Sequence, residues 1–165
     1  FRRVLFRSEE CYDLWSCNNL YWYLTHACSP VTDGLMPYRE ADLLRNILDR
    51  ADAALKEGKK QATLRFGHES CLLPLVALLE LNHYGESYPD VEKLSEQWRA
   101  YDIFPMASNV QFVFFHKKGS NDVLVKVLLN EKEAKLPVKT DVAPYYHWKD
   151  VESYYREKLD KYQHI

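Results

Sequence analysis

Residues 62–81 read ATLRFGHESCLLPLVALLEL, and the character of this stretch changes at its glycine. The residues before Gly67 carry β-type side chains of alternating polarity, which predicts a short strand over Ala62–Phe66. The residues from Cys71 to Leu81 form an apolar run of helical length, so we expect a buried helix there. Pro74 fits the first turn of such a helix, where its missing N–H is harmless. The order of strand, tight glycine turn and helix is typical of an α/β fold.

His68 and Glu69 lie at this turn, between the expected strand and the expected helix. Helix N-termini direct backbone N–H groups and a partial positive charge at whatever lies in front of them. In open α/β sheets, ligands bind at the carboxyl ends of the strands. A histidine beside a carboxylate is more often structural or solvated than catalytic. It is therefore the position at the turn that makes this pair a candidate site.

The chain before this stretch is predicted to be helical. One helix is expected from Glu9 to about His26, and residues 29–34 hold the turn signals that follow it. A second helix is expected over Tyr38–Glu57, where apolar residues form one stripe and charged residues face the opposite side. Gly58 stands where a C-terminal helix cap is expected.

The chain after it mixes strands and helices. Residues 85–108 are polar and rich in turn residues, with a short amphipathic piece around 91–101. Asn109–His116 and Asp122–Leu129 are two β-type runs joined by a short polar loop, which predicts an antiparallel hairpin. The first run is apolar on both faces, as expected for a strand covered on both sides. A final helix is expected over about Trp148–Tyr162.

The bulk composition excludes some classes of protein. The 165 residues amount to about one domain, with 22 basic and 24 acidic side chains and a net charge of −2. This balance argues against a nucleic-acid binder, which would carry a basic stripe. It is compatible with phosphate chemistry, since a few focused cations suffice inside a cleft. No apolar run approaches the length of about 18 residues needed to span a membrane.

The cysteines and histidines form no metal-binding pattern. Cys11, Cys17, Cys28 and Cys71 include no CxxC pair and no zinc framework. An even number permits disulfides in an exported protein, and isolated buried thiols are an equal alternative. Cys71 is interpreted as a buried helix cysteine rather than a nucleophile, because no separate base or oxyanion loop is visible. The histidines other than His68 lack i,i+4 ligand spacing, so no metal site is expected.

The start of the chain has an unusual sequence. Phe1–Ser8 resembles a translated sequencing adapter of the kind left on assembled reads, and the alternative is a natural basic terminus. It has neither Met nor a long apolar segment, so we expect no signal peptide in it. The expected organisation is a non-native segment over 1–8, a helical region over 9–60, and the C-terminal part of an α/β core over 61–165.

The stretch Arg65–Leu75 resembles the second catalytic motif of the histidine acid phosphatase superfamily, most closely that of its multiple inositol-polyphosphate phosphatase (phytase-like) branch. In that motif a strand delivers a His followed by an acidic residue, and an apolar Leu-Leu-Pro-Leu helix comes next. Residues 43–58, 109–130 and 145–155 extend the likeness as supporting pattern. The resemblance implies an α/β chain that is part of a phosphoglycerate-mutase-like histidine phosphatase fold. Such a fold has a mixed sheet flanked by helices, here with part of its helical subdomain.

The same resemblance implies a phosphomonoester hydrolase that works through a phosphohistidine and needs no metal or organic cofactor. An Arg-His-Gly-x-Arg motif supplies the nucleophile in such enzymes. By resemblance, His68 would bind the transferring phosphoryl group, and Glu69 would protonate the leaving oxygen and then help to activate water. Inositol polyphosphates or related small phosphomonoesters are the implied substrates. A periplasmic or secreted location follows from the resemblance alone.

Two features of the chain depart from that family pattern. No Arg-His dipeptide occurs in the 165 residues, so the nucleophile motif is absent and this chain alone is expected to be inactive. The acid follows His68 directly, at Glu69, whereas the inositol-polyphosphate branch has it one position later, where this chain has Ser70. The alternative function is a non-catalytic phosphate-binding or interaction module in which His68 and Glu69 are remnants.

Overall fold

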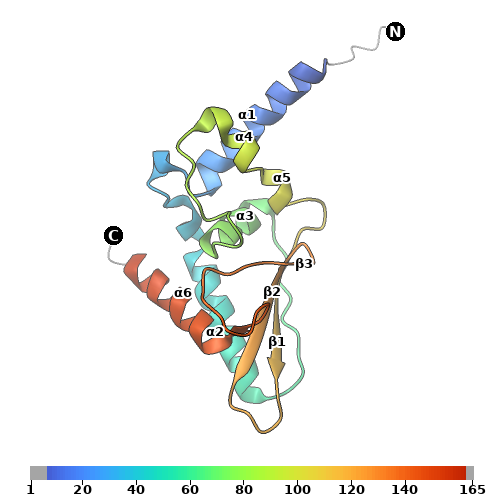
Figure 1. Cartoon of the computed structure of the whole chain (residues 1–165), viewed down its shortest axis with the longest axis vertical. Helices are drawn as coiled ribbons and strands as arrows, with labels where there is room; N and C mark the ends of the chain where they lie inside the picture. The colour runs from blue at the N-terminus through green and yellow to red at the C-terminus, as the bar shows by residue number, and fades with distance from the viewer. Residues whose placement is uncertain (1–6, 163–165) are drawn as a thin grey trace.

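The computed structural model describes residues 7–162, and Figure 1 shows an elongated molecule with helices along most of its length and a small sheet toward one end. The expected non-native segment over 1–8 lies outside the described residues, except for Arg7 and Ser8. The helices are α1 (Ser8–His26), η1 (Pro30–Thr32), η2 (Met36–Glu40), α2 (Ala41–Glu57), α3 (Glu69–Leu78), η3 (Val91–Lys93), α4 (Leu94–Gln97), α5 (Ala100–Ile103) and α6 (Trp148–Tyr162). The strands are β1 (Val110–His116), β2 (Val123–Leu129), β3 (Lys132–Glu133) and β4 (Tyr146–His147).

The first long helix, α1, confirms the helix expected over Glu9–His26, and its N-terminal end extends beyond the rest of the protein (Figure 1). Its second half is fixed by a buried amide. The Asn19 side chain donates to the Trp98 carbonyl at 3.0 Å and accepts from the Ala100 N–H at 2.8 Å. Both ends of a buried amide are thereby satisfied, and the amide joins α1 to the short helices α4 and α5.

The second long helix, α2, confirms the amphipathic pattern. Leu44 and Leu48 are fully buried, and Gly58 takes a left-handed conformation with φ of 65°, as expected of a C-terminal cap. Helix α2 packs against α6, although it belongs to the expected helical region and α6 to the expected α/β core. The division of the chain after residue 60 stays a prediction.

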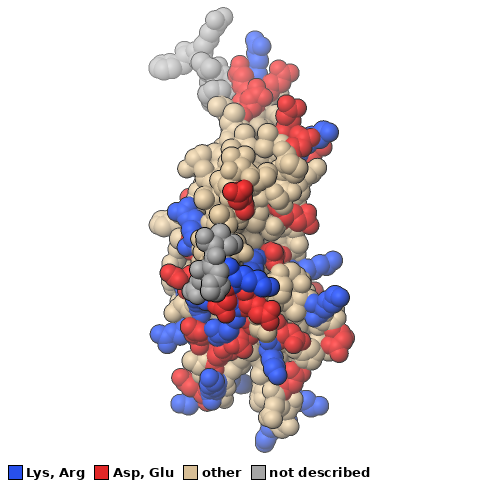
Figure 2. All heavy atoms as spheres, turned by 90° about the vertical axis from the view of Figure 1, so that its left-hand side faces the viewer, with Lys and Arg blue, Asp and Glu red and all other residues tan. Residues whose placement is uncertain are grey.

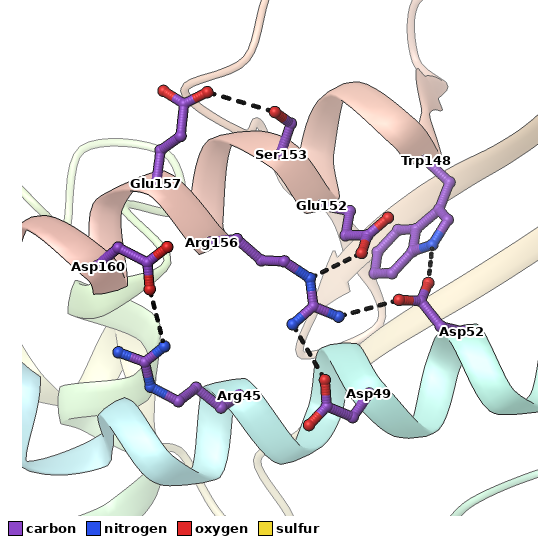
Figure 3. A network of polar contacts seen from close by, with 9 residues as sticks. All are labelled: Arg45, Asp49, Asp52, Trp148, Glu152, Ser153, Arg156, Glu157 and Asp160. Atoms are coloured by element: carbon purple, nitrogen blue, oxygen red, sulfur yellow. Dashed lines mark hydrogen bonds and ion pairs between the residues drawn. The ribbon is translucent and has the colours of Figure 1, made fainter.

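Charged side chains line the contact between α2 and α6 (Figure 3). The guanidinium of Arg156 donates to Glu152 at 2.7 Å, to Asp49 at 3.0 Å and to Asp52 at 2.9 Å. The Trp148 indole N–H donates to the other oxygen of Asp52 at 2.8 Å. Burial acts to raise the pKa of Asp52, but hydrogen bonds from Trp148 and Arg156 and the charge of Arg156 outweigh it, so the pKa is lowered.

We expect Asp52→Asn to lower the free energy of unfolding at pH 7 by about 1–2 kcal/mol, because it removes charge-assisted hydrogen bonds. Because folding lowers the pKa of Asp52, its ionised carboxylate stabilises the fold when the pH is above the usual carboxyl pKa. This stabilisation is lost as the pH falls through the folded-state pKa. The variant should therefore lose less stability than the parent protein between about pH 4 and pH 2. Urea titrations over this range measure both effects. Asp160→Asn is the control, since the exposed Asp160–Arg45 pair should contribute less than about 1 kcal/mol.

The hairpin is confirmed, with β1 and β2 antiparallel from the Val110–Leu129 pair to the His116–Val123 pair. The strand order is β1, β2, β3, and β4 also pairs with β2. The prediction that β1 is covered on both sides is wrong. On one face, the Phe114 ring packs against Trp148 at 4.9 Å, but on the other Phe115 is 41% exposed. Within residues 7–162, the core packs against the Phe112 and Phe114 side of β1, and none of the seven residues of the strand is fully buried.

Strand β1 is also an outer strand of the sheet in the described part of the chain. The Asn130 N–H donates to the Asn109 carbonyl at 2.8 Å, and the Ala134 N–H donates to the Val127 carbonyl at 2.9 Å. Because bonded and non-bonded pairs alternate along an antiparallel ladder, the Phe112–Val127 pair is a non-bonded one. The backbone N–H and C=O of Phe112 therefore point away from β2, toward the outer edge.

Helix α3 lies at the centre of the molecule, between the α1 end and the hairpin end (Figure 1). It confirms the buried apolar helix expected there. Two side chains of α6 cap the carbonyls at its C-terminal end: Lys158 donates to the carbonyl of Leu78 at 2.7 Å, and Tyr155 donates to that of Leu79 at 2.8 Å. The C-terminal helix thus holds α3 by its otherwise unpaired backbone groups.

A close backbone approach after α3 makes Gly85 necessary. A Cβ at this position would lie 2.8 Å from the Cα of Glu80, whose φ of 52° already places it in the left-handed region. We expect Gly85→Ala to lower the free energy of unfolding by about 1–3 kcal/mol, as overpacking does. Thermal unfolding of Gly67→Ala is the matched control, because a Cβ at Gly67 meets no atom within 4 Å. Equal stability of the two variants would contradict the steric argument.

The surface carries charges of both signs. On the face drawn in Figure 2, basic and acidic side chains are interspersed over the lower half of the molecule, and the band above them is largely uncharged. This face shows no continuous basic patch, in keeping with the near-neutral composition. None of the described helices is long and apolar enough to cross a bilayer.

Candidate functional site

His68 and Glu69 form the start of α3. His68 is the N-cap residue, with extended backbone (φ −105°, ψ 164°), and Glu69 is the first residue of the helix. The His68 carbonyl accepts from the N–H groups of Cys71 and Leu72, each at 3.0 Å. The N–H groups that precede them have no carbonyl one turn earlier to bond, so they are open to an anion in front of the helix.

The segment that leads into the site is extended but is not a strand. The strand predicted over Ala62–Phe66 is wrong for the described part of the chain, where these residues pair with no other strand. Leu64 is 75% exposed and Phe66 is 94% exposed. The physical reason is that strand propensity measures fit to a pleated, half-buried surface, and none of the described strands pairs with this segment.

The helix itself begins earlier than the apolar run suggested. It starts at Glu69 rather than Cys71 and ends at Leu78. The expected first-turn position of Pro74 is therefore wrong, and this proline lies inside the helix. A proline there has no N–H to bond the Ser70 carbonyl, the acceptor one helical turn earlier.

The prediction of a buried Cys71 is wrong, since its side chain is exposed. Cys71 lies near the start of α3, ahead of the buried residues 73–78. All four cysteines are free, so the disulfides that an even count permits are not formed in this structure. Burial raises the pKa of the half-buried Cys28 to about 11, which keeps that thiol protonated and unreactive.

Arg65 is anchored beside the site by a contact that the sequence does not reveal. Its guanidinium donates to the Asn46 side-chain oxygen on α2 at 2.7 Å. The contact ties the exposed segment to α2 across 19 positions of sequence, and no local pattern marks Asn46 as its partner. The contact places one cationic side chain on the segment that carries His68.

The turn is open to solvent and carries no metal site. Gly67, His68 and Glu69 are all exposed. A surface hollow of about 540 Å³ lies elsewhere, between α1 and the α4–α5 region, with Tyr12 and Trp15 in its wall. Within residues 7–162, no three His, Cys, Asp or Glu side chains are placed to hold a metal ion. The arrangement can present a proton donor and a helix N-terminus to an anion, but the described residues do not enclose it.

Comparison with known proteins identifies relatives of this arrangement. A family model described as the histidine phosphatase superfamily (branch 2) matches residues 35–130, which include His68 and Glu69. Human multiple inositol polyphosphate phosphatase 1 is 28% identical over an alignment of 134 residues that covers 73% of this chain and 27% of that protein.

Two solved structures are of multiple inositol polyphosphate phosphatase from Bifidobacterium longum. The complex with inositol hexasulfate is 28% identical, with a TM-score of 0.60 over 69% of this chain and 25% of that one. The complex with phosphate is 21% identical, with a TM-score of 0.80 over 92% of this chain and 33% of that one. The second likeness confirms the expected histidine phosphatase fold. The chain spans about a quarter to a third of the length of these relatives.

Proposed function

Because the chain belongs to branch 2 of the histidine phosphatase superfamily, we propose that it is the proton-donor part of a phosphomonoester hydrolase acting on inositol polyphosphates. The observation that carries this proposal is the placement of His68 and Glu69 together at the exposed N-terminus of α3. A helix N-terminus favours a phosphate in front of it. A carboxyl group beside that phosphate is within reach of the ester oxygen, which has to be protonated as it leaves phosphorus.

In the proposed reaction, His68 hydrogen-bonds the phosphoryl group while a nucleophilic histidine attacks phosphorus. The bond from phosphorus to the inositol oxygen breaks, and Glu69 donates its proton to that oxygen. The same carboxylate then takes a proton from the water that hydrolyses the phosphohistidine. An alkoxide is a poor leaving group, so a positioned acid contributes about 10²–10⁴-fold to the rate.

The nucleophile has to come from outside these residues, since the chain has no Arg-His dipeptide. Two observations support a site completed by further protein. The chain spans a quarter to a third of its relatives. The segment before the site exposes two large apolar side chains at alternate positions, Leu64 and Phe66, and neighbouring exposed apolar side chains are typical of a surface that contacts further protein. A periplasmic or secreted location is part of the same proposal.

The absent dipeptide and the open site also favour the second candidate, a non-catalytic phosphate-binding module. The two candidates differ in covalent chemistry. In the complete protein, the enzyme forms a phosphohistidine and releases inorganic phosphate, whereas the module binds its ligand unchanged.

The test uses the complete gene and its protein product. We expect the coding sequence upstream of residue 9 to contain an Arg-His-Gly motif. The complete protein, mixed with ³²P-labelled inositol hexakisphosphate and quenched in alkali, should carry a base-stable and acid-labile label, and phosphate should be released. Binding of the inositol phosphate with neither label nor release would establish the module. An intact upstream sequence without the motif would rule out the enzyme.

A further inference from the structure

A second histidine lies between two carboxylates, on the hairpin side of the molecule. His147 belongs to β4, and its side chain is 30% exposed. Its Nδ1 lies 3.0 Å from an oxygen of Asp122, and its Nε2 lies 3.0 Å from an oxygen of Asp141. Both ring nitrogens thus face a carboxylate at hydrogen-bond distance.

The two contacts of the His147 ring require one particular protonation state of its imidazole. A neutral imidazole has one N–H and one unprotonated nitrogen, whereas an ionised carboxylate only accepts hydrogen bonds. With a neutral His147, either Asp122 or Asp141 would face a lone pair, and that contact would be repulsive. Both contacts are attractive only when the ring carries two protons and a positive charge.

The three side chains come from three segments that meet at this point. Asp122 ends the loop of the β1–β2 hairpin. Asp141 lies in the connection 134–145 between β3 and β4, a stretch without helix or strand. His147 pairs with Leu124 across the ladder and directly precedes Trp148, the first residue of α6. The ring therefore joins the connection to the hairpin where the C-terminal helix begins.

The charged groups that face the ring are these two carboxylates. Asp122 acts from the β2 side and Asp141 from the connection. The nearby cation of β2, Lys126, is engaged elsewhere, since it pairs with Glu133 at 3.1 Å and lies over the Tyr145 ring. We propose that His147, Asp122 and Asp141 form a pH-sensitive clip that holds residues 137–145 of the connection on the hairpin while the imidazole is charged and releases them when the imidazole becomes neutral.

The direction of the pH effect follows from the contacts. Hydrogen bonds to Asp122 and Asp141 raise the pKa of His147 above 6.5, and the bond to His147 lowers the pKa of Asp141. A histidine whose pKa is raised by folding stabilises the folded state. This stabilisation is fully present when the pH is below the unfolded-state pKa, and it is lost as the pH rises through the folded-state pKa. The clip is therefore closed below the usual histidine pKa and opens as the pH rises through the raised folded-state value.

The experiment combines two measurements on the purified protein. Nuclear magnetic resonance of the His147 ring gives its pKa, and hydrogen exchange, corrected for the intrinsic effect of pH, gives the protection of residues 137–145. We expect the pKa of His147 to exceed that of an unfolded histidine. The protection factor of these residues should fall as the pH rises through the folded-state pKa of His147. The fall should be about tenfold for each pH unit by which folding raises that pKa.

Three variants separate a clip from a general effect of pH. His147→Gln should remove the pH dependence of protection, because glutamine does not titrate. Asp141→Asn should keep the fold and lower the pKa of His147. His116→Gln is the matched control, since His116 bonds the Ser120 carbonyl and faces no carboxylate, and it should leave the pH dependence intact. A His147 pKa at the unfolded value, or protection that does not change with pH, would overturn the clip, and so would a His116→Gln variant that loses it.

Discussion

Replacing Glu69 with glutamine in the complete protein should lower kcat for inositol phosphates by about 10²–10⁴-fold, because glutamine keeps the shape of the side chain but donates no acidic proton. Glu69 is the first residue of α3, directly after His68, and its carboxyl group is exposed at the helix N-terminus. The loss should appear in kcat more than in KM, since the proton is transferred in the transition state and not in the bound ground state.

The choice of substrate shows whether the lost function is proton donation. The leaving group of an aryl phosphate is a stable phenolate, so its release needs little protonation. The same variant should therefore retain far more activity on an aryl phosphate than on an inositol phosphate. Glu57→Gln, at the exposed end of α2, is the control and should match the parent on both substrates. Equal losses on the two substrates would count against Glu69 as the acid.

Leu73→Ala should destabilise the fold more than either Asp52→Asn or Gly85→Ala, with a loss of about 2–5 kcal/mol in the free energy of unfolding. The Leu73 side chain is fully buried, in the helix that lies at the centre of the molecule. Removing it leaves a cavity directly behind the turn that carries His68 and Glu69. The variant should therefore lose stability and also hold the site less firmly.

Urea unfolding of Leu73→Ala and Leu72→Ala gives a comparison within one helix. Leu72 is half-buried at the edge of the same core, so its truncation removes less apolar area from contact. We expect the loss for Leu72→Ala to be clearly smaller than that for Leu73→Ala. Similar losses would mean that α3 is not held mainly by its core-facing side.

The sequence predicts the elements whose evidence is local. The apolar stripe of α2 and its glycine cap lie within one run of residues, and so do the two strands and the loop of the hairpin. Each carries its own periodicity and its own turn residues. The family could be recognised from the sequence for the same reason: the residues that identify it lie together between Arg65 and Leu75.

The parts that the sequence does not predict depend on distant partners. Ala62–Phe66 has the pattern of a strand, but a strand also needs a neighbour, which a pattern does not supply. The anchoring of Arg65 by Asn46 joins residues from different elements. The grouping of His147 with Asp122 and Asp141 depends on the ladder between β2 and β4, so spacing alone does not place these residues together.

The outer edge of β1 affects the tendency of this polypeptide to associate in solution. Its seven residues include neither lysine nor proline, the residues by which natural proteins block unwanted strand addition. The free backbone groups of Phe112 lie on an apolar strand of the type that stacks into fibrils. Because no described strand pairs with this edge, we expect isolated copies of residues 1–165 to associate through it. A polypeptide designed to keep the His68 turn in a dispersed protein should therefore also supply a cover for the outer edge of β1.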